Sequence, residues 1–185
     1  DLFAEDGTHP ATQGSAGKAA SMGGEINTTV TMSYSYINLN VLSEHTPSAV
    51  EMLSQLVLNY LPEQVALERV SAGFIRNVSI QKSSPGGQAT ETFNNAMFGD
   101  HPYGQAFPTE QDMDNITVEA VSNFVGSHLV AANSYLYVSG VFDQAETRKA
   151  IEQAFSGMTK GTASSIPAVE GKGAGEVIFV DREAA

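Results

Sequence analysis

The sequence predicts an α+β fold, with a mainly antiparallel sheet covered by helices. Apolar and polar residues alternate twice between residues 25 and 43, which indicates two neighbouring strands. Several segments with helical spacing follow, and then a further strand and a helix. Strands, then helices, then a strand–helix unit is the order typical of α+β domains. The 185 residues are enough to bury a sizeable core.

The first element is expected to be a short or distorted helix within residues 1–22. Alanines favour a helix there, but glycines interrupt it at about 1 kcal/mol each. Gly23 and Gly24 are expected to end it. The next two strands fill residues 25–43, because side chains such as Ile37 and Leu39 alternate with asparagines. We expect the turn between these strands near residues 32–34.

Three helices are expected next. Thr46-Pro47 is a favourable helix start, and the apolar face that follows runs to about Asn59. A second helix spans residues 63–82, with Phe74 and Ile75 facing inward. Residues 83–87 are predicted to be a loop, and residues 88–98 a third helix.

Thr117 is expected to cap another helix, which runs to about His128 and buries Phe124. A strand over residues 133–140 and a helix over residues 144–155 complete this part. We therefore predict a first domain over residues 1–158. A stretch rich in Gly, Ser, Ala and Thr predicts a linker over residues 159–175, and residues 176–185 hold the first strand of a second domain.

Composition narrows the possible partners. The chain has 9 Lys and Arg against 21 Asp and Glu, a formal net charge of −12, so nucleic acid and anionic membranes are poor partners. No apolar run approaches the roughly 20 residues of a membrane span. The chain has no cysteine, which excludes disulfides and thiolate metal sites. These features are compatible with a bacterial periplasm and do not establish it.

Three motifs occur in a recognisable order and spacing. They are Gly23-Gly-Glu-Ile-Asn27, Phe98-Gly-Asp-His-Pro-Tyr-Gly104 and Tyr135-Leu-Tyr-Val-Ser-Gly140. Together they resemble the first domain of the M16 zinc peptidases, the insulinase-like, pitrilysin-like and mitochondrial-processing-peptidase-like family. The resemblance covers most of residues 1–181. It implies that the first domain is incomplete at its start and that the last strand begins a second M16-like domain.

The resemblance does not extend to the zinc ligands. In the family, a His-x-x-Glu-His helix precedes a Gly-Thr step, which Gly7-Thr8 resembles. Counting back from Gly7-Thr8 places the second His of that helix at Leu2. Counting back from Gly23-Gly24 places it at Asp1. The third ligand, a Glu, falls at Arg76, and no carboxylate lies between Glu68 and Glu91. We therefore expect no catalytic residue, no metal ligand and no cofactor within this chain; zinc is implied if the motif lies upstream.

The histidines offer no replacement metal site. No two of the four lie three or four residues apart, so no helical pair exists; they are His9, His45, His101 and His128. His101 sits in a loop motif where the family resemblance implies a structural role. Satisfied structural or surface histidines are the simpler interpretation for all four.

One binding surface is implied by the resemblance. In the family, the strand that follows the Gly-Gly motif pairs with an extended peptide substrate. The matching residues here are Asn27, Thr28 and Thr29, with Thr28 in place of the usual Ala. An ordinary half-exposed strand explains the same residues. The implied partners are a peptide or unfolded polypeptide, and a second M16-type subunit or domain.

The sequence leaves three functions open. The first is a non-catalytic subunit or half, which encloses and binds peptide beside a zinc-bearing partner. The second is an active zinc metalloendopeptidase whose His-x-x-Glu-His motif lies upstream of residue 1, with Glu68 or Glu91 as third ligand. The third is a binding or assembly module without proteolytic function.

Overall fold

A computed structural model describes residues 14–169, 175 and 177–181 of the chain. The chain divides into two compact units. The first holds the residues up to Leu67 together with Thr117–Ser165, and the second holds Glu68–Ile116 with the residues from Ile166 onward. The two units are described separately. In the described part, no helix is long and apolar enough to cross a membrane.

The described part of the first unit begins with the short helix α1 (Ser15–Ser21) and a β-hairpin. Gly23 has a φ of 69°, a left-handed conformation that glycine adopts without strain, and it separates the helix from the hairpin. Strands β1 (Glu25–Val30) and β2 (Ser35–Asn40) pair antiparallel, with Val30 opposite Ser35. The predicted helix, strands and turn are confirmed.

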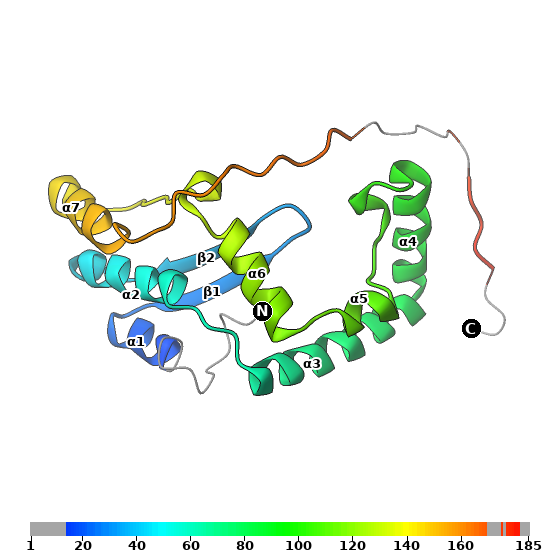
Figure 1. The fold of residues 1–185 in the computed structure, drawn as a ribbon, viewed down its shortest axis with the longest axis horizontal. Coiled ribbons are helices and arrows are strands. Elements are labelled where there is room, and N and C mark those ends of the chain that lie inside the picture. The colour runs from blue at the N-terminus through cyan, green and yellow to red at the C-terminus, as the bar shows by residue number, and fades with distance from the viewer. Residues whose placement is uncertain (1–13, 170–174, 176, 182–185) are drawn as a thin grey trace. The chain divides into compact units, whose positions relative to one another are not determined.

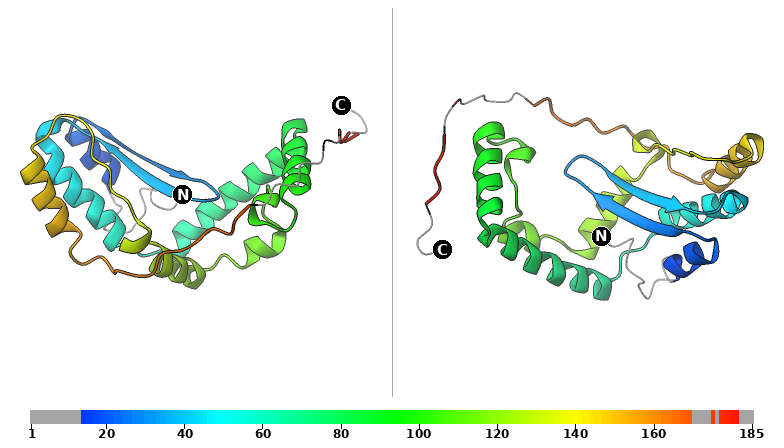
Figure 2. Two further views of the ribbon diagram at one scale, coloured as in Figure 1. Left: turned by 90° about the horizontal axis from the view of Figure 1, so that it is seen from above. Right: turned by 180° about the vertical axis from the view of Figure 1, so that it is seen from behind.

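The core of the first unit lies between the hairpin and the helices. Helix α2 (Thr46–Leu58) packs beside α7 (Gln144–Ala154), and the hairpin runs along them (Figure 1). Ile26 and Leu39 pack against the buried cluster from one face of the hairpin. The buried members come from α1, the residue after it and α2; they are Ala19, Met22, Ala49, Met52 and Leu56. The opposite face of the hairpin is uncovered by described residues (Figure 2).

Helix α6 (Val118–His128) also belongs to the first unit. The Thr117 hydroxyl accepts a hydrogen bond from the Ala120 N–H, which confirms the predicted cap. The prediction that Phe124 is buried was wrong, since its side chain is 62% exposed. Instead of entering a core, the Phe124 ring stacks on that of His128, with centroids 4.4 Å apart.

Residues 134–140 form no strand ladder with any described residue, so the predicted strand is not observed as a paired strand. Tyr135 and Tyr137 stack on each other and are 83% and 85% exposed. The short 3₁₀ helix η3 (Ala131–Asn133) lies immediately before this segment. An aromatic and β-branched sequence favours a strand, but a strand also needs a neighbour with which to share hydrogen bonds.

Residues 159–164, a few positions after α7, are held against η3. The Ala131 N–H donates to the Thr159 carbonyl at 2.9 Å, and the Ser164 N–H donates to Asn133 Oδ1 at 2.6 Å. Gly161 has a φ of 60°, and a Cβ there would lie 2.4 Å from the buried side chain of Val130. The start of the predicted linker is therefore docked on the first unit.

Between Glu68 and Ile116, the second unit is built of helices. Helix α3 (Gln64–Ser83) runs into it, followed by α4 (Pro85–Phe98), the 3₁₀ helix η2 (Pro102–Gly104) and α5 (Glu110–Asp114). The loop predicted for residues 83–87 was wrong beyond Ser84. The Ser84 hydroxyl accepts a hydrogen bond from the Gly87 N–H at 3.0 Å, and Pro85 suits the first helical position.

Helix α3 does not have the inward face that its sequence suggests. Phe74 and Ile75, predicted to face inward, are 47% and 50% exposed. Leu67, near the start of the helix, is its one fully buried residue. Ile80, farther along the helix, is 61% exposed as well, so most of the large apolar side chains of α3 are exposed.

Candidate functional site

The free edge of β1 is the candidate peptide-binding site. Among described residues, β1 pairs on one side only, with β2. The Thr31 N–H donates to the Tyr34 carbonyl at 2.9 Å, and hydrogen-bonded pairs alternate along an antiparallel ladder from there. The backbone groups of Asn27 and Thr29 therefore point toward β2, whereas those of Thr28 point away from it. Of the three predicted residues, Thr28 offers its main chain to an added strand.

Ile26 and Val30 share this outward direction, and the sequence interpretation missed both. The signal was available in the tight turn at residues 32–33, because a hairpin turn fixes which residues are hydrogen-bonded across the pair. Ile26, Thr28 and Val30 together present a row of N–H and C=O groups, two residues apart, along the edge of β1. Such a row is what an extended peptide needs for strand addition.

The two faces of the hairpin differ in chemistry. Asn27 lies opposite Asn38, and Thr29 lies opposite Tyr36, on the face away from the core helices. Thr28 alternates with these residues and lies on the same face as Ile26. Its hydroxyl oxygen is buried and has no hydrogen-bond partner. An unpaired buried hydroxyl costs roughly 1–3 kcal/mol, so the Thr28 hydroxyl lowers the stability of the fold.

Arg76 lies on α3, with an exposed side chain. The stretch from Arg69 to Thr90 spans most of α3 and the start of α4 without a carboxylate. Within residues 14–169, 175 and 177–181, no three His, Asp or Glu side chains lie close enough together to hold a metal. Leu2, Asp1, the Gly7-Thr8 step and His9 lie outside the described residues. The described part does not fit a zinc ion.

The histidines inside the described part make local contacts. His101 Nδ1 accepts a hydrogen bond from the Tyr103 N–H at 3.2 Å and so caps η2. Its Nε2 lies 3.4 Å from the Pro167 carbonyl oxygen. His128 Nδ1 lies 2.8 Å from the Ser127 hydroxyl, and His45 lies 3.6 Å from the Glu44 carboxylate. These contacts support the interpretation of all three as structural or surface histidines.

Among the described residues, two side chains have clearly shifted pKa values. The Thr109 backbone N–H, the Thr109 hydroxyl and the Gln105 amide all hydrogen-bond to Asp112, and they hold the pKa of that carboxyl below its ordinary value. Thr109 and Asp112 form the capping box of α5, which accounts for the effect. Burial raises the pKa of Tyr60, just beyond α2, to about 12. Neither group belongs to the β1 edge.

Comparison with known sequences gives relatives named as zinc proteases. An uncharacterized zinc protease of Rickettsia bellii is 27% identical over 148 residues, which is 78% of this chain and 35% of that protein. One of Streptomyces coelicolor is 20% identical over 146 residues, covering 77% of this chain and 32% of that protein. The chain thus spans about a third of the length of these relatives. No protein-family model matches it.

Solved structures share the fold. A protease from Helicobacter pylori superposes with a TM-score of 0.70 at 14% identity, over 84% of this chain and 38% of that one. A peptidase M16 inactive domain from Pseudomonas fluorescens gives 0.65 at 15% identity, over 91% and 45%. A chain of complex III₂ from Candida albicans gives 0.66 at 15% identity, over 94% and 43%.

These comparisons define the fold of the chain. The fold is M16 peptidase-like, since a peptidase M16 inactive domain and a protease superpose on it, and the relatives found by sequence are named zinc proteases. The predicted α+β class, with an antiparallel sheet and covering helices, is confirmed as well.

Proposed function

We propose that this chain is part of a non-catalytic M16-like subunit or half, which binds extended peptide beside a zinc-bearing partner. The observation that carries the proposal is Arg76. It occupies the position where the family resemblance places the third zinc ligand, and it carries a positive charge. Two positive charges repel each other, so a guanidinium at that position opposes Zn²⁺ instead of holding it.

The free edge of β1 supports the binding half of the proposal. Main-chain groups of Ile26, Thr28 and Val30 point away from β2, and a strand added there gains hydrogen bonds that do not depend on its side chains. Such binding suits a protein that encloses peptides of varied sequence. The net charge of −12 favours basic peptides over acidic ones.

The names of the relatives favour one alternative. Both are called zinc proteases, and they extend well beyond the matched region. An active zinc metalloendopeptidase would need its His-x-x-Glu-His motif outside these 185 residues and a carboxylate such as Glu68 or Glu91 in place of Arg76. That protein would cleave peptides on its own and lose the activity in a chelator.

The test is peptide binding and cleavage by the full protein. We expect a fluorescent, basic, extended peptide to bind without being cleaved, with or without a chelator. Thr28→Pro removes the N–H that points away from β2, so it should weaken peptide binding. The variant should still fold, since proline is tolerated on an edge strand where the N–H faces solvent. Thr28→Val keeps the main chain intact and serves as the matched control.

Two results would overturn the proposal. Chelator-sensitive cleavage by the protein alone would establish the active-peptidase alternative. Equal binding by the Thr28→Pro and Thr28→Val proteins, both shown to be folded by circular dichroism, would remove the β1 edge as the binding surface.

A further inference from the structure

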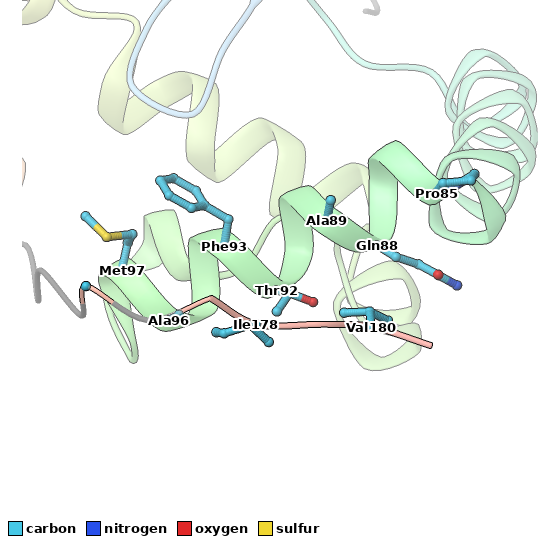
Figure 3. A pocket seen from close by; sticks show the side chains of 10 residues that line it. Pro85, Gln88, Ala89, Thr92, Phe93, Ala96, Met97, Ile178 and Val180 are labelled. Atoms are coloured by element: carbon cyan, nitrogen blue, oxygen red, sulfur yellow. The ribbon is translucent and has the colours of Figure 1, made fainter. Parts of the chain in front are cut away.

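Helix α4 carries an apolar groove between two rows of side chains. One row holds Ala89, Phe93 and Met97, and the other holds Thr92 and Ala96 (Figure 3). Residues four apart lie one above another on a helix, so the two rows run side by side with a furrow between them. The furrow opens into a cavity of about 430 Å³. No side chain of α4 is fully buried, and Phe93 is 59% exposed.

A segment from the end of the chain lies along this groove. Ile178 and Val180 line the cavity (Figure 3). They are 51% and 50% exposed, while Val177 and Phe179 are 78% and 90% exposed. Alternate residues of an extended chain point to opposite sides. The segment therefore presents one row of aliphatic side chains to α4 and the other row to solvent.

A second contact in the same unit involves Pro167, which precedes this segment in the sequence. Because His101 Nδ1 accepts the Tyr103 N–H, the neutral ring carries its proton on Nε2. This Nε2–H faces the Pro167 carbonyl oxygen at 3.4 Å. His101 thus tethers Pro167 to the loop that directly follows α4.

We propose that the α4 groove is a docking site for an extended aliphatic segment, and that residues 177–180 of this chain are its occupant. The ligand class is an extended peptide with β-branched aliphatic residues at alternate positions. Ala89 and Ala96 leave room for such side chains, and a larger side chain at either position would fill the furrow. The inference is independent of the peptide-binding edge on β1.

The docked segment is only partly buried, so it can be displaced from α4 at a small cost in free energy. Ile178 and Val180 remain half exposed, so each gives up only part of the free energy of full burial when it leaves. Apolar residues at every position from 177 to 180 are typical of a strand covered on both faces. The uncovered row, Val177 and Phe179, is free to pack elsewhere while the segment lies on α4.

Cysteine cross-linking tests the docking directly, because the 185 residues contain no cysteine. In the full protein, freed of any cysteine elsewhere, Thr92→Cys is combined with Ile178→Cys, and in the matched control with Phe179→Cys. We expect the first pair to form an intramolecular disulfide at least about fivefold faster under mild oxidation, since disulfides demand Cβ atoms that face each other. All three positions lie on the surface of the unit or in the groove, so folding is preserved. Equal rates for the two pairs would overturn the proposal.

Two additions test displacement and the tether. A free peptide with the sequence Val-Ile-Phe-Val-Asp should slow the cross-linking of the first pair in proportion to its concentration. His101→Asn keeps a cap acceptor for Tyr103 but cannot reach Pro167, so it should slow cross-linking, whereas the control His128→Asn should not. No effect of the peptide up to millimolar concentration would contradict a displaceable occupant. No difference between the two histidine variants would contradict the tether.

Discussion

The two units of the molecule bury their apolar residues very differently. Every fully buried hydrophobic side chain of the described residues lies in the first unit, from Ala19 to Val130. The described residues of the second unit contain none, although they include Phe74, Ile80 and Phe93, which are 47%, 61% and 59% exposed. The first unit has a core, and the second presents apolar helix surface.

This difference shows that amphipathic helices alone do not make a core. Helix α2 buries its apolar face in the core with α1 and the hairpin and packs beside α7, whereas α3 and α4 have few described neighbours to pack against. The proposed docking of residues 177–180 covers part of the apolar surface of α4. The predictions below test the contrast, from the largest effect to the smallest.

Truncation of Leu56 tests the core of the first unit. Its side chain is 1% exposed, so Leu56→Ala should lower the free energy of unfolding by about 2–5 kcal/mol. The control Phe74→Ala, in the second unit, should cost less than about 1 kcal/mol because Phe74 is already half exposed. Chemical denaturation followed by circular dichroism measures both. If Phe74→Ala lowered the free energy of unfolding as much as Leu56→Ala, the contrast between the two units would be wrong.

Gly161 tests how the chain after α7 is held on the first unit. An added Cβ would lie 2.4 Å from Val130, and the φ of 60° disfavours any side chain. We expect Gly161→Ala to cost roughly 2 kcal/mol, because strain and a steric clash act together. Gly157→Ala, where nothing lies within 4 Å, is the control. Equal melting temperatures for the two variants would argue that this segment is not docked.

Asp143 tests the start of α7. Its carboxylate accepts a hydrogen bond from the Glu146 N–H at 2.8 Å, so Asp143→Ala should cost about 1 kcal/mol. Asp143→Asn keeps the acceptor and should recover most of the loss. A cost for the Asn variant equal to that for Ala would show that charge, and not the cap, is what matters.

Thr28 offers a stabilising change. Thr28→Val replaces the unpaired buried hydroxyl with a methyl group of similar volume, and it should raise the free energy of unfolding by about 1 kcal/mol. Thr29→Val, on the opposite face of the same strand, is the matched control and should change stability less. A loss of stability in Thr28→Val would mean that the hydroxyl has a partner, such as a bound water.

Tyr60 gives the smallest effect, confined to alkaline pH. Its pKa is raised by burial from 10.0 to about 12, so the unfolded chain ionises this phenol before the folded one does. Its contribution to stability is therefore complete below pH 10 and declines as the pH rises toward 12. Ultraviolet titration of the phenolate, with Tyr60→Phe to identify its signal, measures the pKa. A midpoint near 10 would show that Tyr60 is solvated.

The sequence predicted the positions of local elements better than their burial and pairing. Local signals located the hairpin, the Thr117 cap and α7, because alternation, caps and helical spacing act within a few residues. Phe74, Phe124 and residues 134–140 were mispredicted because burial and strand pairing require neighbours that local sequence does not reveal. Similarly, the outward direction of Thr28 follows from the hairpin register and not from its motif.

The metal content of the complete protein tests the central claim most directly. Elemental mass spectrometry after mild dialysis counts the zinc bound per chain, and a stoichiometric catalytic zinc would need protein ligands. With Arg76 at the position of the third ligand, we expect no stoichiometric zinc. About one zinc per chain, lost together with peptide cleavage in a chelator, would contradict the account and show that the protein is a zinc peptidase in its own right.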